Sequence, residues 1–331
     1  MRIGVVIPTY NRANLLAETL DAILAQTVAP DRVVVVDDGS TDHTPDVLAR
    51  YAARAGVQSV RVPNGGDLAA RNVGTGLCDT DLVAYCDSDD LWTPEHLARM
   101  AAFWQACPEL RVAYADFRIV RDGVWQKSRK FDDAPGGFWD GLEPLDAPAG
   151  AGIFRAPIVA RLIGFQPFFP SAMVVRRADF LAAGGWDEVP GRIVIGDFAT
   201  ALRMAECVPF GVLRQPSVGI RKHGHNLSGD VQRMTLGESL VLEHVLRTRP
   251  SLAPCAAAIR SSIIHRRLAA LDTAFARHDY AGVRDILALI PPAGRSRAAV
   301  LKAAVANLPP PLRGPTANLL LAAGSFRSRM R

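Results

Sequence analysis

The stretch Leu82-Val83-Ala84-Tyr85-Cys86-Asp87-Ser88-Asp89-Asp90-Leu91-Trp92 runs from a short apolar segment into three carboxylates within four residues. The apolar segment predicts a buried strand of a parallel sheet, and ligands bind just beyond the carboxyl ends of such strands in open α/β sheets. Crowded carboxylates repel one another unless a cation holds them, and Mg²⁺ or Mn²⁺ takes oxygen ligands. A turn in which Asp90 or Thr93 caps a following helix is the alternative.

The N-terminal third of the chain alternates strand and helix patterns. Apolar runs predict strands over residues 3–7, 32–36, 57–62 and 82–86, and helical spacing predicts helices over 14–25, 45–55 and 66–77. Such a βαβ series predicts an α/β fold with a mostly parallel sheet flanked by helices. The first strand is not followed by GxGxxG, and GxxxxGK[ST] is absent from the sequence, which argues against a dinucleotide-binding Rossmann domain and a P-loop NTPase.

Polar clusters follow three of these strands, over residues 8–12, 37–40 and 87–90. Ligand groups are expected where parallel strands end, so the three clusters point to one binding edge. Beyond them the pattern predicts strands over 112–120, 169–175 and 208–213 and a helix over 177–183. Residues 123–152 show no clear periodicity and are expected to form a flexible segment that faces an acceptor, or an insertion without function.

The order and spacing of these motifs resemble glycosyltransferase family 2, which has the GT-A fold. The resemblance extends to about Ser228 and rests on Val6-Ile7-Pro8-Thr9-Tyr10-Asn11-Arg12, Val35-Val36-Asp37-Asp38-Gly39-Ser40-Thr41-Asp42, Ala69-Ala70-Arg71-Asn72-Val73-Gly74 and Asp87-Ser88-Asp89-Asp90-Leu91-Trp92. It implies a GT-A type, Rossmann-like domain over residues 1–230 with a helical, basic C-terminal extension over 231–331.

The family resemblance also implies an activity. It indicates an inverting, metal-dependent, hexosyltransferase-like enzyme that moves a sugar from a nucleotide-diphospho-sugar to an acceptor hydroxyl, in surface-glycan, polysaccharide or glycoconjugate biosynthesis. The acceptor would be a glycan, a lipid-linked compound or another hydroxyl compound, and no nucleic acid partner is expected. The divalent cation, Mn²⁺ or Mg²⁺, would bridge the two phosphates and stabilise the departing nucleoside diphosphate.

Residues of the first two clusters are expected to hold the donor's nucleotide. The resemblance places Pro8, Tyr10 and Arg12 around the base, although Tyr10 could equally be an aromatic residue of the core. An ionised carboxylate only accepts hydrogen bonds, so Asp37 or Asp38 could accept from the imide or amide edge of the base.

Arg71 has the guanidinium fork that suits phosphate, unless it is an ordinary exposed charge on its helix. Its neighbour Asn72 is expected to brace the loop that carries the acidic motif.

The family's DXD motif corresponds to residues 87–89 here. Asp89 is the expected metal ligand, and Asp87 with Ser88 would contact the ribose hydroxyls or a water on the metal. Asp90 is expected to be structural, at the start of the following helix. His223 resembles a position that approaches the metal or the diphosphate, with His225 as a substitute and a surface histidine without a role as the alternative.

Gly196-Asp197 resembles the acidic pair that carries the family's catalytic base, but the Glu that usually precedes the Asp is missing. Asp197 would remove the acceptor proton while the hydroxyl attacks the anomeric carbon opposite the leaving group, which gives inversion. The alternative is an N-cap, because Asp before a helical segment suits that position.

The last hundred residues differ in charge from the rest of the chain. Residues 232–331 contain 15 Lys and Arg and 5 Asp and Glu, a net charge of +10, whereas the remainder has 23 and 28, a net charge of −5. Apolar spacing predicts helices over 236–247, 253–276, 280–289 and 297–307. A basic region of this kind predicts contact with a membrane surface or an acidic partner. Residues 312–331 fit an interfacial amphipathic segment, a packed helix or a disordered end.

The chain of 331 residues has 49% hydrophobic residues, enough for one large domain or two. Its five cysteines are scattered and never spaced as CxxC, which predicts reduced thiols. The N-terminus lacks the pattern of a signal peptide, and no uncharged stretch reaches the roughly 20 residues of a spanning helix. A cytoplasmic protein, or one peripheral at the inner face of the membrane, is therefore expected.

Two other functions are compatible with parts of this pattern. A nucleotidyltransferase also holds nucleotide and metal on an α/β sheet, but residues 8–12 do not form its Gly-rich, basic loop. A nucleotide-sugar-binding protein that has lost catalysis would explain Gly196 in place of Glu.

Overall fold

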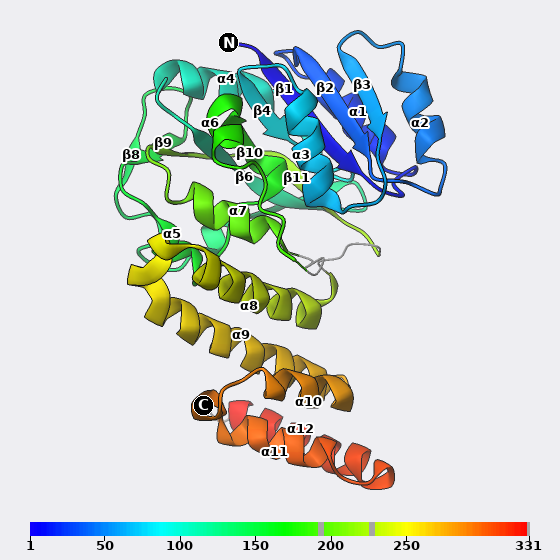
Figure 1. Cartoon of the computed structure of the whole chain (residues 1–331), viewed down its shortest axis with the longest axis vertical. Helices are drawn as coiled ribbons and strands as arrows, with labels where there is room; N and C mark the ends of the chain where they lie inside the picture. Colours follow the sequence, from blue (N-terminus) through cyan, green and yellow to red (C-terminus); the bar gives the residue numbers. More distant parts are fainter. Residues whose placement is uncertain (191–194, 225–228, 330–331) are drawn as a thin grey trace. The chain divides into compact units, whose positions relative to one another are not determined.

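The chain divides into two compact units in the computed structural model, which describes residues 1–190, 195–224 and 229–329, with side chains to residue 322. One unit comprises Met1–Arg192 with Asp197–Gly224, and the other comprises Ile193–Gly196 with His225–Arg331. Figure 1 shows a sheet with flanking helices in the first and a series of helices in the second. The domain boundary expected at residue 230 stays a prediction.

Four parallel strands form one side of the sheet in the N-terminal unit. They are β1 (Ile3–Thr9), β2 (Arg32–Asp37), β3 (Val57–Arg61) and β4 (Leu82–Tyr85), in the order β3-β2-β1-β4. The connecting helices are α1 (Leu16–Leu24), α2 (Thr44–Tyr51) and α3 (Asp67–Leu77). The predicted α/β fold and the parallel βαβ series are therefore confirmed.

The sheet continues from β4 as a mixed sheet with the overall order β3-β2-β1-β4-β10-β6-β11-β9-β8. These strands are β6 (Val112–Arg121), β8 (Leu142–Pro144), β9 (Ala151–Phe154), β10 (Met173–Arg176) and β11 (Phe210–Lys222). Strand β10 is antiparallel to β4 and β6, whereas β11 is parallel to β6. The short β5 (Leu91–Trp92) pairs with β11, and β7 (Val124–Arg129) pairs with β6. Helices α4 (His96–Ala106), α5 (Val159–Leu162), α6 (Arg177–Ala182) and α7 (Asp197–Met204) complete the unit.

Residues 123–152 were expected to form an irregular, flexible segment, and this prediction is wrong. It contains β7, a 3₁₀ turn over Lys130–Asp133, β8 and the start of β9. Strand β7 forms a hairpin with β6, β8 pairs with β9, and β9 pairs with the distant β11. These strands are short and leave little periodic signal. Strand β11 is also longer than expected, because it continues past an irregularity between Leu213 and Val218.

A close contact between α3 and β1 fixes the helix that carries Arg71. A Cβ atom added at Gly74 would lie 2.4 Å from Val6 Cγ1 and 3.2 Å from Val36 Cγ2. Real Cβ atoms do not approach a neighbour so closely, so only glycine allows α3 to pack at this distance. Arg71 lies one turn before Gly74 on the same helix, so this contact sets how far Arg71 stands from the sheet.

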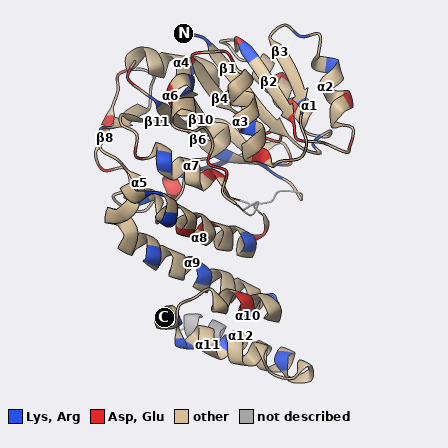
Figure 2. Ribbon diagram, viewed as in Figure 1, with Lys and Arg blue, Asp and Glu red and all other residues tan. Residues whose placement is uncertain are grey.

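The C-terminal unit consists of helices with their own apolar core. They are α8 (Val231–Thr248), α9 (Ala256–Ala276), α10 (Tyr280–Ala288), α11 (Arg297–Ala306) and α12 (Pro310–Arg329). Helix α8 packs on α9, where Arg266 Nε lies 2.7 Å from Glu238 Oε2 and Arg267 Nη2 lies 2.7 Å from Glu243 Oε2. Figure 2 shows Lys and Arg recurring along these helices. The predicted helices are confirmed.

The end of the chain packs as a helix where its side chains are described. Ala317 is buried, and Leu320 and Leu321 pack against the core of the unit, whereas Leu319 is 74% exposed. The packed-helix alternative is therefore correct for residues 317–321, and the side chains of Arg327, Arg329 and Arg331 lie outside the described part. No helix in the described ranges is both long and apolar enough to cross a bilayer.

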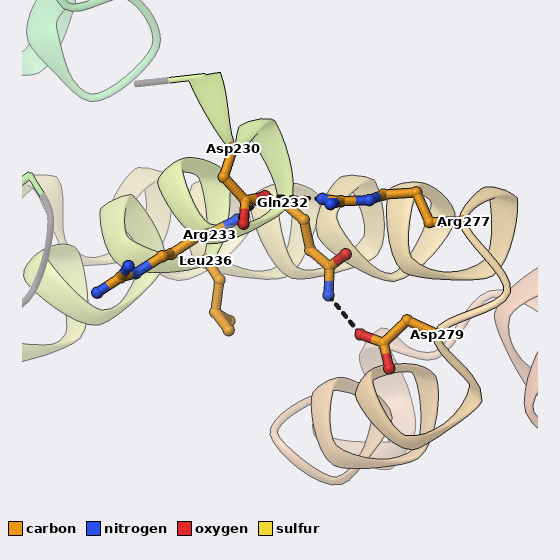
Figure 3. Close-up of a pocket in the computed structure, with 6 residues that line it drawn as sticks. All are labelled: Asp230, Gln232, Arg233, Leu236, Arg277 and Asp279. Atoms are coloured by element: carbon orange, nitrogen blue, oxygen red, sulfur yellow. Dashed lines mark hydrogen bonds and ion pairs between the residues drawn. The ribbon is translucent and has the colours of Figure 1, made fainter. Parts of the chain in front are cut away.

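A polar cavity of about 460 Å³ lies among α8, the end of α9 and the start of α10 (Figure 3). Arg277 Nη1 lies 2.9 Å from Asp230 Oδ1, and Gln232 Nε2 donates to Asp279 Oδ2 at 3.0 Å. Asp230 and Asp279 also cap the N-termini of α8 and α10, respectively. The lining groups of this cavity therefore serve largely to join the helices to one another.

Candidate active site

Arg71 forms the centre of a buried ion-pair cluster beyond the carboxyl end of β4. Its Nη1 lies 2.5 Å from Asp67 Oδ2, its Nη2 lies 2.5 Å from Asp87 Oδ1, and its guanidinium stands over the ring of Trp186. The residue is only 3% exposed, so the alternative of an ordinary exposed helix charge is wrong. Burial lowers the pKa of Arg71, but the charges of Asp87 and Asp67 raise it overall, so the guanidinium stays charged.

Asp89 contacts two residues for which the sequence predicts different roles. Its Oδ2 lies 3.1 Å from His223 Nε2 and 3.2 Å from Arg12 Nε. The two expected metal ligands are therefore neighbours, and whether His223 has a role stays a prediction. Arg12, expected beside the base, has its guanidinium at the acidic turn. His225, the expected substitute, lies outside the described residues.

Asp90 is buried and joins three segments of the sheet. Its Oδ2 accepts a hydrogen bond from Ser171 Oγ at 2.5 Å, and its Oδ1 accepts from the Arg221 amide at 3.0 Å. Helix α4 begins only at His96, with Glu95 at the N-cap position, so capping by Asp90 or Thr93 is wrong. Burial, followed by the charges of Asp89 and Asp87, raises the pKa of Asp90 well above its ordinary value.

The pKa of Asp87, in the turn that also contains Asp90, is raised above its ordinary value. Burial is the main cause, and the charge of Asp89 adds to it, while Arg71 acts in the opposite direction. Ser88 is also buried, and its carbonyl accepts a hydrogen bond from Thr19 Oγ1 at 3.1 Å. Asp87 and Asp90 therefore stand in a turn where burial and like charges oppose their ionisation.

Arg221 is a site residue whose role was missed from the sequence. Its Nη1 lies 2.6 Å from Glu18 Oε2, its Nη2 donates to Thr19 Oγ1 at 2.7 Å, and its Nε donates to the Asp89 carbonyl. It thereby ties the end of β11 to α1 and to the acidic turn. Its position two residues before His223, which the sequence placed near the metal or the diphosphate, was the available signal.

The turn after β2 is held mainly by backbone amides. Asp37 Oδ1 accepts from the Ser40 amide at 2.9 Å, and Asp38 accepts from the Gly65 and Gly66 amides at 2.7 and 2.9 Å. Both carboxylates are nearly inaccessible, with 2% and 3% exposure. Their protein partners therefore occupy several of the acceptor positions that a nucleotide base would use.

The residues around this turn lie as follows. Tyr10 is 44% exposed, so the alternative of a core aromatic is wrong, whereas Pro8 is buried within β1. The Asn11 amide donates to Ser40 Oγ at 2.9 Å, which joins the clusters after β1 and β2. Arg61 was missed from the sequence; its Nη2 donates to the Ser40 carbonyl at 2.6 Å.

Asp197 begins α7 and lies within the electrostatic reach of Arg71. It is the first residue of the helix rather than its N-cap, and it is partly buried. Burial raises the pKa of Asp197 to about 7; Arg71 lowers it, and the charges of Asp67 and Asp87 raise it again. A carboxyl that titrates near neutral pH beside an Arg cluster is suited to accept a proton.

Asn72 connects the helix of Arg71 to the segment before α7. Its Nδ2 donates to the Trp186 carbonyl at 3.0 Å and to Glu188 Oε1 at 3.0 Å, and its Oδ1 accepts from the Trp186 amide at 2.7 Å. The expectation that it braces the acidic loop is therefore wrong; it braces residues 186–188. Asp187, in that segment, accepts from Thr200 Oγ1 of α7 at 3.0 Å.

The N-terminal half of the chain matches a known family. Residues 4–160 match the model for Glycosyl transferase family 2. The chain is 42% identical over 101 residues to the succinoglycan biosynthesis protein ExoW of Rhizobium meliloti, covering 29% of this chain and 32% of that protein. It is 41% identical over 104 residues to a validoxylamine A glucosyltransferase of Streptomyces hygroscopicus, covering 30% and 23%. The match spans about a third of the length of the first curated relatives.

Solved structures resemble the chain over most of its length. S. aureus TarS 1-349 in complex with UDP-GlcNAc superposes with a TM-score of 0.61 at 19% identity, covering 92% of this chain and 88% of that one. The mannosyltransferase PcManGT of Pyrobaculum calidifontis, in complex with GDP-Man and Mn²⁺, gives 0.53 at 22% identity, covering 92% and 86%. Residues 4–160 therefore match glycosyl transferase family 2, and the fold shared with these structures is the GT-A fold that the sequence motifs predicted.

Proposed function

We propose that this chain is an inverting glycosyltransferase that moves a sugar from a nucleotide-diphospho-sugar to an acceptor hydroxyl in glycan biosynthesis. The observation that carries the proposal is the meeting of Arg71 with Asp87 and of Asp89 with His223, at one edge of a family 2 sheet. Cationic and acidic side chains gathered beyond parallel strands suit an anionic, cation-bound ligand. The solved structures of TarS and PcManGT contain UDP-GlcNAc and GDP-Man, respectively, and these ligands support a donor of this chemical class.

The donor is proposed to lie across the two acidic turns. Pro8, Tyr10, Asp37 and Asp38 would line its base, with the exposed ring of Tyr10 as the most accessible of them. Asp38 would act mainly by holding residues 64–66 in place, because its oxygens already accept from that loop.

The sugar diphosphate is assigned to the second turn. Asp87 and Ser88 would contact ribose, Arg71 would face a phosphate, and Arg12 is reassigned from the base to the diphosphate because it lies beside Asp89.

Asp89 and His223 are the residues that would hold a divalent cation. In the described part of the chain, no three His, Cys, Asp or Glu side chains gather into a complete metal site. The neighbouring Asp89 Oδ2 and His223 Nε2 nevertheless fit a cation that shares its coordination with the substrate, since Mg²⁺ is commonly held by one or two carboxylates plus substrate phosphates. When bound, Mn²⁺ or Mg²⁺ would supply positive charge to the departing diphosphate.

Asp197 is proposed as the general base. Ionised Asp197 would take the proton of the acceptor hydroxyl as its oxygen bonds to the anomeric carbon. The bond from that carbon to the phosphate oxygen breaks on the opposite face, and the electron pair leaves with the nucleoside diphosphate. Single displacement inverts the anomeric carbon, and the pKa of about 7 leaves a useful fraction of Asp197 ionised at neutral pH.

A direct test separates this function from a nucleotide-sugar-binding protein that has lost catalysis. Thermal unfolding is measured with UDP, GDP and dTDP, each with and without Mn²⁺, and transfer is assayed for Asp197→Asn. We expect one nucleotide to stabilise the protein more strongly with Mn²⁺. A nucleotide-sugar-binding protein without catalysis would bind the nucleotide but would not release nucleoside diphosphate from the sugar donor. Failure of every nucleotide to bind would contradict the proposal.

Peripheral membrane contact through the C-terminal unit is proposed from its charge. Residues 232–331 carry a net charge of +10, and Leu319 is exposed on α12. Basic surfaces with exposed apolar side chains bind anionic lipid surfaces. Co-sedimentation with vesicles of phosphatidylcholine and phosphatidylglycerol tests this, and binding equal to that of pure phosphatidylcholine vesicles would contradict it.

A further inference from the structure

A cavity of about 260 Å³ lies beside the ends of β6 and β11 in the N-terminal unit. Phe117 and Ile119 of β6, Ile220 of β11 and Phe169 supply its apolar lining. Ile119 pairs with Ile220 across the two strands, and the rings of Phe117 and Phe169 meet edge to face at 4.8 Å. Small-molecule pockets usually measure roughly 300–1,000 Å³, so this cavity suits one sugar-sized group.

The polar side of the same cavity is mainly cationic. Arg129, Lys130 and Lys222 line it together with one carboxylate, Asp133, which gives a formal balance of +2. Asp132 pairs with Arg129 at 2.6 Å, and counting its charge as well lowers the formal charge balance to +1. Lys130 Nζ lies 3.2 Å from Asp133 Oδ2, but both side chains reach solvent, and such surface pairs contribute only about 0–1 kcal/mol. An anionic ligand can therefore compete with them.

The cavity adjoins the candidate active site along β11. Ile220 and Lys222 flank Arg221, which holds the acidic turn, and Lys222 directly precedes His223, which lies 3.1 Å from Asp89 Oδ2. The other wall comes from Ser128, Arg129 and Lys130, within the segment that the sequence predicted to face an acceptor. Lys222 also lies within electrostatic reach of Asp90 and Asp89, so a ligand held here would lie near the acidic turn.

We infer that this cavity is the acceptor subsite and that it selects an acceptor sugar bearing a phosphate or carboxylate group. The apolar rings would contact the C–H face of the sugar, and Arg129, Lys130 and Lys222 would contact its anionic group. The inference rests on the proposed glycosyl transfer, and it specifies the acceptor class that the family does not. The acid could belong to a free sugar phosphate, a uronate or the phosphate of a lipid-linked sugar.

The first experiment compares the affinities of defined probes by calorimetric titration. We expect glucose 6-phosphate and glucuronate to bind at least about tenfold more tightly than methyl glucoside, the difference that one charge-assisted hydrogen bond supplies. Inorganic phosphate should bind more weakly than glucose 6-phosphate, because it lacks the ring. Equal binding of methyl glucoside, or phosphate binding as tightly as glucose 6-phosphate, would overturn the inference. A short-chain prenyl phosphate sugar then distinguishes a lipid-linked source from a free one.

Two matched pairs of variants locate the binding. Lys130→Glu reverses a lining charge, and Lys127→Glu makes the same change at an exposed position of β7 that does not line the cavity. We expect about tenfold weaker glucose 6-phosphate binding for the first only. Ser128→Trp fills the cavity from its exposed rim, with Lys127→Trp as the control, and should weaken glucose 6-phosphate and glucuronate alike. Equal effects of a variant and its control would place the sugar elsewhere.

Nucleoside diphosphate binding, measured on the same variants, separates this inference from the proposed function. It should stay within about twofold of the unmodified protein, because neither Ser128 nor Lys130 contacts the acidic turns. Retained nucleotide binding without preference for anionic sugars overturns the acceptor assignment alone. If the unmodified protein binds no nucleoside diphosphate, the donor assignment is contradicted instead.

Discussion

Two acidic turns follow parallel strands of the same sheet, yet they satisfy their carboxylates in different ways. Asp37 and Asp38, after β2, accept mainly from backbone amides of residues 40, 65 and 66. Asp87, Asp89 and Asp90, after β4, meet Arg71, Arg12, His223 and Ser171, with a single backbone amide at Asp90.

Backbone amides cannot leave their positions, whereas side chains can exchange partners when a ligand arrives. The first turn is therefore built to hold a loop, and the second turn is built to receive charge. The raised pKa values of Asp87 and Asp90 agree with this division, because burial and mutual repulsion oppose their ionisation. The difference teaches that two acidic turns of one sheet can differ in whether backbone amides or side chains hold their carboxylates.

Asp89→Asn should give the largest effect, because it weakens the proposed cation ligand. We expect transfer to fall by more than the roughly 100-fold that loss of an outer partner of a metal ligand costs. The free energy of unfolding should change little, because relief of the repulsion from Asp87 and Asp90 offsets the loss of the contacts with Arg12 and His223. Initial rates with Mn²⁺ and urea unfolding measure the two quantities, and Asp46→Asn on the exposed surface of α2 is the control. An active Asp89→Asn protein would remove the distinction between the turns.

Asp38→Asn should do the opposite and reduce stability. The amide keeps one acceptor oxygen for the Gly65 and Gly66 amides, so one charge-assisted hydrogen bond is lost. We expect the free energy of unfolding to fall by about 1.5–3 kcal/mol. Urea titration measures it beside Asp89→Asn, and a smaller loss for Asp38→Asn than for Asp89→Asn would reverse the comparison.

The pH dependence of transfer should report how the acids paired with Arg71, Asp67 and Asp87, act on Asp197. The base must be ionised, so kcat/KM should fall about tenfold per pH unit below the Asp197 pKa of about 7 and level off above it. Asp67→Asn removes a charge that raises this pKa, so the midpoint should move to lower pH. An unchanged midpoint in Asp67→Asn would indicate that another group titrates.

Arg61→Ala should give the smallest effect, within the first turn. Arg61 is exposed, its Nε lies 3.8 Å from Asp37 Oδ2, and backbone amides already hold that turn. We expect the free energy of unfolding to fall by less than about 1 kcal/mol, as for other surface pairs. A loss as large as that of Asp38→Asn, in the same urea titration, would show that side chains hold the first turn as well.

The parts of the fold that were predictable are those with local signals. The apolar runs of β1, β2 and β4 predict buried parallel strands, because both faces of these strands are covered, whereas the edge strand β3 is partly exposed. Strands β7 to β9 were missed, because they are short; of the three, only β9 pairs with a strand distant in sequence, β11.

The site residues divide along the same line. Family motifs placed Arg71, Asp89 and His223 correctly near one edge, although their catalytic and binding roles stay predictions. Asp90 looked like a helix cap in sequence, but its partners Ser171 and Arg221 are 81 and 131 residues away. Such tertiary contacts override local preference and leave no mark on a single sequence.

The contact between Gly74 and Val6 has a consequence for genetics. Any side chain at position 74 would push α3 away from β1 and carry Arg71 with it, although position 74 lies in no proposed ligand contact. In a random mutant library, inactivating alleles should therefore recur at codon 74. Second-site substitutions that replace Val6 with a smaller residue should rescue them. Such suppressor pairs would map the helix-to-sheet spacing without any structure determination.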